Sequence, residues 1–234
     1  MPKAPAVIGS LFESVFGRPS HVLDVAEPAP GFLELEVRAA PPIGGWHPGH
    51  EIQLRVAPGL TRRYTVRAVS GADADRIGIL VATDAEGPGT TWMRRLRAGT
   101  GTTLLAGPHL PLRQNGTRRL YLGDSSALGA INAYAQSSDG HVVTVETSAE
   151  AVSSLTSRWP RYTFLAATST PGDALQAWLE RAVDDGTLTG LDAAVLLGHA
   201  QSIQRQRRVL IDRQVMPRRA LTTKPYWANG KQGL

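Results

Sequence analysis

The first half of the chain alternates apolar and polar residues with a period of two, which is typical of strands that bury one face. Glycine and proline cluster between the alternating runs, as at residues 40–45 and 58–59, and indicate turns. The pattern predicts strands over residues 32–37, 51–56, 62–69, 77–82 and 102–106. Short strands at this regular spacing favour an antiparallel barrel or a sandwich.

One short helix interrupts this series. The sequence Gly87-Pro88-Gly89 opens it and Gly99 closes it, so we expect a helix over residues 90–97. Two threonines stand at its start as the expected N-caps, and arginines gather toward its end, where the helix dipole favours positive charge.

Beyond residue 113 the pattern changes, because strand-like runs now alternate with helix-period segments. Strands are predicted over residues 119–123, 142–146, 162–167 and 193–197. The clearest helix is residues 173–185, whose apolar positions recur at the spacing of one helix face before Gly186 ends it. Alternating strands and helices predict a parallel α/β sheet. A boundary within residues 108–116 divides the chain into predicted domains of residues 1–112 and 113–234.

The amino-acid composition excludes several kinds of functional site. The 234 residues include no cysteine, which excludes disulfides, thiolate metal sites and cysteine nucleophiles. Lys and Arg number 25 against 20 Asp and Glu, a formal charge of +5 that attracts phosphates, carboxylates or nucleic acid without choosing among them. The first ten residues hold no apolar signal region, and no stretch approaches the ~20 apolar residues of a membrane span. We therefore expect a cytoplasmic protein with no membrane partner. A monomer is the default expectation.

Four stretches carry candidate chemistry, and the first begins at Arg62 in a predicted strand. The period of two places Arg62, Tyr64 and Val66 on one face, with Thr65 and Arg67 on the other. Such a strand can offer a guanidinium to a pyrophosphate, a ring to stack on a flavin and a hydroxyl to the polar edge of that flavin. The alternative is an ordinary solvated edge strand.

The second and third stretches stand at predicted helix starts. Residues 87–92 leave backbone N–H groups open to an anion, or else form a plain capped helix with Trp92 in the core. Residues 123–131 follow an apolar strand at the place of a second phosphate or nucleotide site. They match neither the G-x-G-x-x-G fingerprint nor a G-x-S-x-G nucleophile elbow.

The fourth stretch is the polar tail of residues 224–233, which contains Tyr226 and Trp227 side by side. Tails usually fray, but two large aromatic residues near the end of a chain favour docking against a planar ligand or another domain.

In order and spacing, the four stretches resemble the siderophore-interacting protein family, the FAD-binding ferric-siderophore reductases of the ferredoxin reductase-like superfamily. The family patterns R-x-Y-T, G-P-A-S-x-W, G-D-E-T-A-L-P-A-I and a terminal G-Y-W all have counterparts. The family helix G-E-A-x-x-x-x-x-L-R-R-x-L is matched by the segment from Gly198 to Leu210, which includes Arg207. The resemblance implies an antiparallel Greek-key β-barrel that binds FAD, followed by an α/β domain with a parallel, NAD(P)-binding-like sheet.

The resemblance also implies site residues. For FAD these are Arg62, Tyr64, Thr65, Val66, Thr83, Gly87, Gly89, Thr90, Thr91, Trp92, Tyr226 and Trp227, and for NAD(P)H they are Gly123, Asp124, Ser125, Ser126 and Arg207. Arg62 is expected to pair with the pyrophosphate, Tyr64 to pack on the flavin and Thr65 to bond its ring edge. The N–H groups of Gly89 and Thr90 complete the phosphate site, and the two terminal aromatic residues cover the flavin or the nicotinamide cleft.

Departures from the family concentrate in the nicotinamide half. His199 stands where the family has Glu, Ser125 and Ser126 replace Glu and Thr, and Gly129 replaces Pro. In the barrel half, residues 81–84 lack the histidine that commonly precedes the G-P turn.

Three functions follow from this sequence. The first is an FAD enzyme that passes electrons from NAD(P)H to a small-molecule substrate, a ferric siderophore or a similar Fe(III) chelate, without a protein acid or base. The second is a flavin-holding protein of the same fold that has lost NAD(P)H turnover and acts in a biosynthetic pathway. The third is a binding module without redox chemistry.

Two other clusters carry weaker chemistry. His47 and His50 are separated by Pro-Gly and lack a carboxylate partner at ligand spacing, so no metal site is predicted. The basic run at residues 204–208, with Arg213, Arg218 and Arg219, lacks interleaved aromatic residues, so no nucleic-acid partner is predicted. A solvated helix face, a 2′-phosphate site and a site for an anionic ferric chelate remain open for it.

Overall fold

The computed structural model describes residues 17–106, 111–136 and 140–230. The chain divides into two compact units. The barrel unit comprises Met1–Leu112 with Asn132–Tyr134, and the α/β unit comprises Arg113–Ile131 with Ala135–Leu234. Residues 108–110 of the predicted boundary lie outside the described residues, as do residues 231–233 of the predicted aromatic tail.

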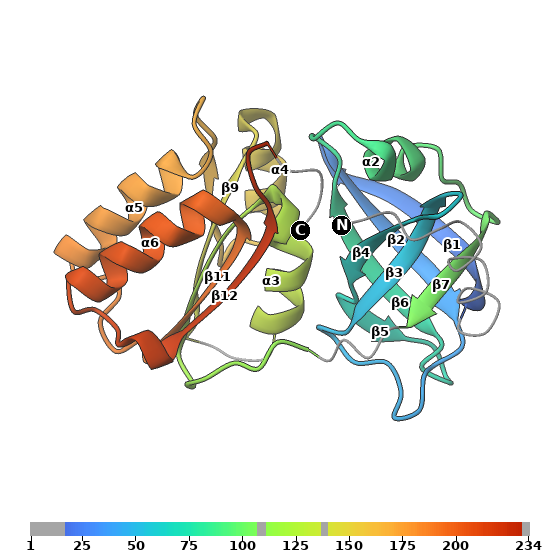
Figure 1. Cartoon of the computed structure of the whole chain (residues 1–234), viewed down its shortest axis with the longest axis horizontal. Coiled ribbons are helices and arrows are strands. Elements are labelled where there is room, and N and C mark those ends of the chain that lie inside the picture. Colours follow the sequence, from blue (N-terminus) through green and yellow to red (C-terminus); the bar gives the residue numbers. More distant parts are fainter. Residues whose placement is uncertain (1–16, 107–110, 137–139, 231–234) are drawn as a thin grey trace. The chain divides into compact units, whose positions relative to one another are not determined.

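The described part of the barrel unit contains one seven-stranded antiparallel sheet (Figure 1). Its order is β4-β3-β7-β1-β2-β6-β5. The strands are β1 (Gly17–Ala29), β2 (Phe32–Ala39), β3 (Glu51–Ala57), β4 (Leu60–Thr65), β5 (Ala68–Ser70), β6 (Arg76–Ala82) and β7 (Gly101–Ala106).

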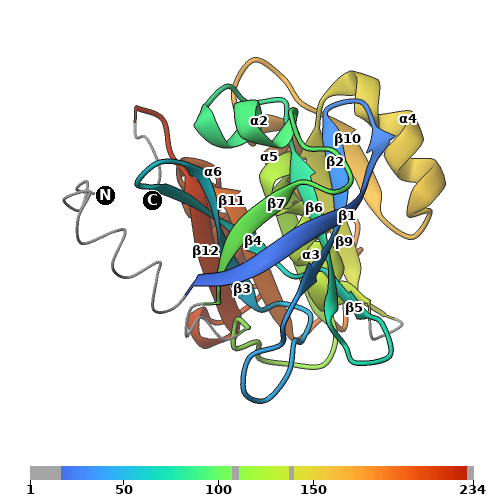
Figure 2. The same cartoon turned by 90° about the vertical axis from the view of Figure 1, so that its right-hand side faces the viewer.

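The sheet closes on itself at Val66 and Arg67. These residues join β4 and β5, which are consecutive in the chain but stand at opposite ends of the sheet order. Val66 N donates to the His50 carbonyl on the β3 side, and Arg67 N donates to the Gly78 carbonyl on β6, each over 2.8 Å. The chain thus passes from one edge of the sheet to the other in two residues, and the strands wrap into a barrel (Figure 2).

Inward side chains of the strands fill the barrel. Leu35 on β2, Ile52 on β3 and Ile77 on β6 are fully buried in one cluster. Met93 and Leu96, in and just after the short helix α2 (Pro88–Met93), join the same cluster. The helix is therefore fixed to the barrel by its apolar face rather than by its intrinsic stability, which is small at this length.

Helix α2 begins two residues earlier than predicted and ends four residues earlier. Gly87 is its N-cap and Pro88 occupies the first turn, where a missing N–H costs nothing. Thr90 and Thr91 therefore lie inside the helix, and no side chain caps it, so the expected threonine caps were wrong.

The described part of the α/β unit contains one five-stranded parallel sheet of order β10-β9-β8-β11-β12. Its elements are β8 (Arg119–Asp124), η1 (Ser125–Ala127), α3 (Leu128–Ala135), β9 (Val142–Thr147), α4 (Ala149–Arg158), β10 (Thr163–Ala166), α5 (Asp173–Asp184), β11 (Ala193–His199), α6 (Ala200–Asp212), η2 (Arg218–Ala220) and β12 (Leu221–Trp227). Helices α5 and α6 lie on one face of the sheet and α3 on the other (Figure 1).

The central strands of this sheet are apolar because helices cover both faces. All seven residues of β11 are buried, and Leu120, Tyr121 and Leu122 on β8 are fully buried. Such continuous apolar runs are what a doubly covered parallel sheet requires. The predicted antiparallel barrel followed by a parallel α/β sheet is confirmed.

The prediction lacks two strands and merges two others. Both missing strands contain proline, which argues against a strand in a sequence pattern. Strand β1 contains Pro19 and Pro28, and its two register shifts break the alternation of apolar and polar residues. Strand β12 contains Pro225. The predicted strand over residues 62–69 is divided into β4 and β5 by the barrel closure. In the described ranges, no helix is long and apolar enough to cross a membrane.

Candidate functional site

Strand β4 and helix α2 meet at one point on the barrel. A Cβ atom built on Gly89 would lie 3.2 Å from the Tyr64 hydroxyl and 3.2 Å from Arg62 Cγ. These side chains therefore approach the helix backbone as closely as a glycine allows. The fold thus brings together two stretches that the sequence separates by more than twenty residues.

The polar groups at this point are free to bind a ligand. Arg62 Nη1 donates to the neighbouring Thr61 carbonyl over 3.0 Å, and no carboxylate of the described residues pairs with its guanidinium. Tyr64 is half-buried against the barrel core, and burial raises the pKa of its phenol while the charge of Arg62 opposes that rise. At neutral pH the Tyr64 hydroxyl is therefore a hydrogen-bond donor.

Helix α2 adds backbone donors beside them. The Thr91 N–H donates to the Gly87 carbonyl over 2.9 Å and forms the first intrahelical bond. The N–H groups of Gly89 and Thr90 precede it in the first turn, where helix geometry supplies no acceptor. A guanidinium, a phenol and two amides thus share one place on the barrel.

The other predicted flavin residues surround this point less closely. Trp92 is half-buried and packs against the barrel core, and Val66 is fully buried at the barrel closure. Thr83 is buried, and its carbonyl accepts a 2.6 Å hydrogen bond from Arg94. Thr65 is half-buried at the end of β4. Val66 and Thr83 therefore stabilise the barrel locally and do not present side chains to a ligand.

The strand order of the α/β unit reverses its direction of growth between β8 and β11. From β8 the chain proceeds outward through β9 and β10, and then returns to add β11 and β12 on the other side. Ligands of open α/β sheets bind outside the carboxyl ends of the strands at such a switch point. Here those ends carry Asp124 on β8 and His199 on β11.

The Asp124 carboxylate joins the elements that meet at this switch point. Its Oδ1 accepts from the N–H and hydroxyl of Ser126, and its Oδ2 accepts from His199 N over 2.7 Å and from Trp227 Nε1 over 2.9 Å. Gly198 has φ +107°, and a Cβ there would lie 2.4 Å from Asp124 Oδ2, so only glycine fits. Burial raises the pKa of Asp124, and the four donated hydrogen bonds oppose that rise.

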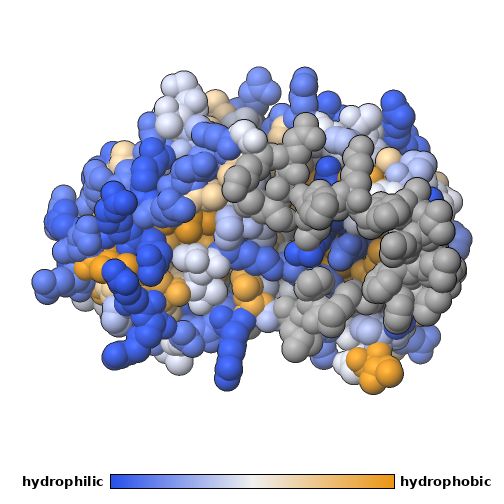
Figure 3. All heavy atoms as spheres, in the orientation of Figure 1, coloured by the Kyte–Doolittle hydropathy of each residue, from blue (hydrophilic) through white to orange (hydrophobic). Residues whose placement is uncertain are grey.

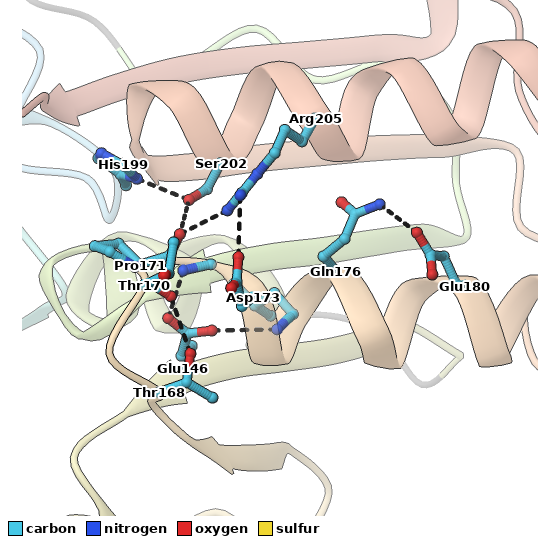
Figure 4. A network of polar contacts seen from close by, with 12 residues as sticks. Glu146, Thr168, Thr170, Pro171, Asp173, Gln176, Glu180, His199, Ser202 and Arg205 are labelled. Carbon is cyan, nitrogen blue, oxygen red and sulfur yellow. Dashed lines mark hydrogen bonds and ion pairs between the residues drawn. The ribbon is translucent and has the colours of Figure 1, made fainter.

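His199 is held in one orientation by its neighbours. Its ring is 4% exposed and stacks on the Trp227 indole with centroids 4.3 Å apart. Nδ1 lies 2.7 Å from Ser202 Oγ, and that hydroxyl donates over 2.8 Å to the Pro171 carbonyl (Figure 4). Because the single hydroxyl proton is used on Pro171, Nδ1 carries a proton and donates to Ser202. The other ring nitrogen, Nε2, is buried without a partner.

Other polar groups near the sheet edge are also used internally. Ser125 Oγ donates to Thr147 Oγ1 over 3.0 Å. Glu146 accepts from Gly172 N over 2.6 Å and Leu175 N over 3.2 Å, so a carboxylate already occupies the N-terminus of α5. At Gly123 a Cβ would lie 2.8 Å from Ala127, which makes this glycine a packing requirement.

A pocket of about 240 Å³ adjoins His199 at the start of α6. Its lining residues are Thr170, Pro171, His199, Gln201, Gln204, Arg205, Arg208 and Asn229. The set contains no carboxylate, and it contains Arg205 and Arg208 rather than the predicted Arg207. Helical spacing explains this, since residues 201, 204, 205 and 208 share one face of α6. The sequence prediction named only the basic run at residues 204–208 and singled out Arg207; the helical spacing is the signal that distinguishes Arg205 and Arg208 from it.

The structure therefore places the predicted residues in two groups. Arg62, Tyr64, Gly89 and Thr90 come together on the barrel, whereas Asp124, Ser126 and Trp227 come together in the α/β unit. Tyr226 is half-buried in β12 beside Trp227, so both lie in a parallel strand rather than in a frayed tail. Sequence reasoning missed the His199–Ser202–Pro171 chain because its members belong to separate elements. No group of three or more metal-ligating side chains occurs in the described residues.

Solved structures resemble the chain over nearly its full length. The siderophore-interacting protein from Acinetobacter baumannii has a TM-score of 0.74 at 18% identity, with 92% of each chain covered. The siderophore-interacting protein SipS from Aeromonas hydrophila has a TM-score of 0.67 at 20% identity, covering 93% of this chain and 94% of its own. The ferredoxin reductase of carbazole 1,9a-dioxygenase has a TM-score of 0.66 at 18% identity, covering 90% of this chain and 67% of its own.

These likenesses confirm the resemblance at the level of the fold. The chain has the two-domain fold of siderophore-interacting proteins and of the ferredoxin reductase of carbazole 1,9a-dioxygenase. No protein-family model and no curated protein matches the sequence.

Proposed function

We propose that the chain is an FAD-dependent reductase that takes electrons from NAD(P)H and delivers them to a ferric siderophore or a similar Fe(III) chelate. The observation that carries this proposal is the contact of Arg62, Tyr64 and Gly89 on the barrel. It combines a guanidinium that no carboxylate of the described residues pairs with, an aromatic ring and a close approach to helix amides that requires a glycine, which together suit a planar cofactor with a pyrophosphate.

Within this proposal each barrel residue has one task. Arg62 pairs with the pyrophosphate, and the N–H groups of Gly89 and Thr90 donate to its oxygens. Tyr64 packs its ring on the flavin and donates its hydroxyl, which its raised pKa keeps protonated. Bound flavin supplies the conversion of a two-electron hydride donor into single electrons, of which each ferric ion accepts one. The protein itself needs no acid or base for that transfer.

A second candidate function comes from the α/β unit. The Asp124 carboxylate already accepts hydrogen bonds from the backbone N–H groups of His199 and Ser126 and from the Trp227 indole N–H. A switch point whose amides are committed in this way is less available to a dinucleotide phosphate. This favours the alternative in which the chain holds FAD without NAD(P)H turnover and acts in a biosynthetic pathway on a substrate bound beside the flavin.

The visible absorption spectrum tests the proposal. Purified protein is titrated with FAD, and bound flavin is followed by its bands at roughly 380 and 450 nm. Anaerobic NADPH is then added, followed by a ferric siderophore. Bleaching by NADPH and recovery on addition of the chelate support the reductase. Bands that persist under NADPH support the second candidate, and protein that never binds FAD contradicts both.

A further inference from the structure

Because the strands of the α/β sheet are parallel, the residues that precede them meet at one edge of the sheet. Neighbouring strands lie about 4.8 Å apart, so the edge of this sheet is roughly 20 Å long. Five arginines stand along it, from the turn before β10 to the residues before β12: Arg161, Arg118, Arg119, Arg218 and Arg219. We call these five residues the arginine row.

Hydrogen bonds join the parts of the arginine row at β8 and β12. Arg119 donates from Nε to the Asn115 carbonyl over 2.8 Å and from Nη2 to the Gly116 carbonyl over 2.6 Å. Asn115 Nδ2 in turn donates to the Arg219 carbonyl over 2.8 Å. The segment before β8 is therefore fastened to the segment before β12, which keeps these arginines side by side.

Arg118 extends the arginine row across the middle of the sheet. A Cβ atom built on Gly140 would lie 3.3 Å from Arg118 Nε, and one built on Gly190 would lie 2.7 Å from its Nη1. These glycines belong to the loops before β9 and β11, so the guanidinium lies beside the amino ends of both strands. Arg118 is exposed, as are three of the other four members of the row.

Little negative charge stands against the arginine row. In the described ranges, no carboxylate pairs with the four members at β8 and β12. Asp192, just before β11, accepts its hydrogen bonds from Thr117 and from the Arg118 backbone N–H rather than from a guanidinium. The helix ends at the same edge are balanced, with three arginines and three aspartates: Arg158, Arg181, Arg213, Asp184, Asp185 and Asp212. Hydrophilic side chains project from the lower side of this unit in Figure 3.

Two aromatic rings stand at one end of the arginine row. Trp159 and Tyr162 are half-buried, and the Tyr162 N–H donates to the Trp159 carbonyl over 2.9 Å to close the turn before β10. Their rings are nearly parallel, with centroids 6.4 Å apart, and the Arg158 guanidinium lies 5.1 Å from the centre of the Trp159 ring. Tryptophan and tyrosine flanked by arginine are typical of surfaces at the level of lipid headgroups.

We propose that this edge of the sheet docks on an anionic lipid surface. A small anion would touch only part of a row of this length, whereas lipid phosphates form an extended array, and a guanidinium binds a phosphate through two N–H groups. Trp159 and Tyr162 then lie among the headgroups. Such docking requires no membrane-spanning helix, and it departs from the sequence expectation of no membrane partner.

The proposal is independent of the proposed function. Asp124 and His199 stand at the opposite, carboxyl edge of the same sheet, so docking at the amino edge leaves them uncovered. Flavin absorbance in the presence and absence of vesicles reports on the proposed function separately, so failure of one does not imply failure of the other.

Co-sedimentation of the full chain with vesicles tests the proposal. We expect binding to phosphatidylcholine vesicles that contain about 30% phosphatidylglycerol and none to vesicles of phosphatidylcholine alone. Binding should weaken about tenfold or more when the salt is raised from about 0.1 M to about 0.5 M, because exposed charges are then screened. Failure to bind the anionic vesicles overturns the proposal.

Two double variants locate the docking surface. Arg218→Gln with Arg219→Gln removes two exposed charges from the arginine row and should weaken vesicle binding about tenfold or more. Arg63→Gln with Arg95→Gln is the matched control, because it removes the same charge from exposed positions of the barrel unit, and it should bind within about twofold of the wild type. Equal weakening in both would show that net charge alone attracts the vesicles, which contradicts the proposal.

The aromatic end and the class of partner are tested last. Trp159→Phe should weaken vesicle binding about threefold, since the indole favours the headgroup region, and unchanged binding would contradict the placement of this turn in the bilayer interface. A single-stranded oligonucleotide of about 20 nucleotides is the competing probe. Binding of this probe by a protein that ignores the anionic vesicles would assign the arginine row to nucleic acid and overturn the proposal.

Discussion

The barrel and the α/β unit use their candidate site residues in opposite ways. On the barrel, Arg62 and Tyr64 lie against Gly89, and their polar ends bond no other side chain in the part of the chain that the structure describes. In the α/β unit, Asp124 and Trp227 bond each other across 103 residues of sequence. Groups that are free in the protein are available to a ligand, whereas groups that are satisfied internally mainly stabilise the fold. The comparison predicts that barrel substitutions change flavin affinity and that α/β substitutions change stability.

The largest expected effect on stability is at Gly172, which has φ +81° and precedes α5. In Gly172→Ala the new Cβ would lie 2.4 Å from Ser202 Cβ, so backbone must move in addition to the strain of a left-handed residue. We expect a loss of about 3 kcal/mol in the free energy of unfolding, measured by urea titration. Gly45→Ala is the control, with φ +82° and no atom within 4 Å of the new Cβ, and should lose only about 1 kcal/mol. Equal losses would contradict the close packing at Gly172.

The next effect concerns ligand affinity alone. Arg62→Ala should weaken FAD binding by about 2–3 kcal/mol, roughly 30- to 150-fold, because a charge-assisted contact to pyrophosphate is lost. Its urea midpoint should remain that of the wild type. Arg63→Ala, an exposed neighbour on the opposite face of β4, is the matched control and should keep full affinity. Retained flavin affinity in Arg62→Ala would remove Arg62 from the site.

Trp227→Phe should have a smaller and purely structural effect. The ring can still stack on His199, but the Nε1–H bond to Asp124 is lost, so we expect a loss of about 1 kcal/mol in unfolding free energy. Trp159→Phe removes an indole whose N–H makes no hydrogen bond in the described structure, so it controls for the change of ring size. A greater loss in Trp159→Phe would show that packing, not the hydrogen bond, dominates.

The smallest expected effect is a pH dependence at Asp124. Burial raises its pKa, so between its unfolded and folded values the native state binds more protons than the unfolded state. The contribution of protonated Asp124 to the free energy of unfolding is thus fully present below the pKa that Asp124 has in the unfolded chain. It is lost as the pH rises through the pKa that Asp124 has in the native state. The stability difference between wild type and Asp124→Asn should therefore shrink as the pH rises from about 4. A difference that grows with pH would show that the donated hydrogen bonds outweigh burial.

Sequence patterns predict the elements whose environment is uniform along the strand. The apolar runs at β8 and β11 are predicted directly because helices cover both faces of that sheet. The patterns fail where a strand changes partner or contains proline. Strand β4 ends at Thr65 because the barrel closes there, and that closure depends on where His50 and Gly78 lie in the folded chain.

The candidate sites divide in a similar way. Arg62, Tyr64 and Gly89 belong to short local motifs, so their proximity can be anticipated from a family resemblance. The Ser202 bridge joins His199 at the end of β11 to Pro171 in the loop that precedes α5, through a side chain in the first turn of α6. No spacing in the sequence encodes that bridge, because it arises from the packing of α5 against α6 (Figure 4).

The closure of the barrel at Val66 also bears on aggregation. The two edge strands have only 6 and 3 residues, so the edges that the described sheet leaves without a partner strand are short. Exposed strand edges are where sheets of different molecules join. The candidate flavin motif therefore lies on a strand protected against intermolecular pairing, and chains that have not yet acquired a cofactor are expected to remain dispersed.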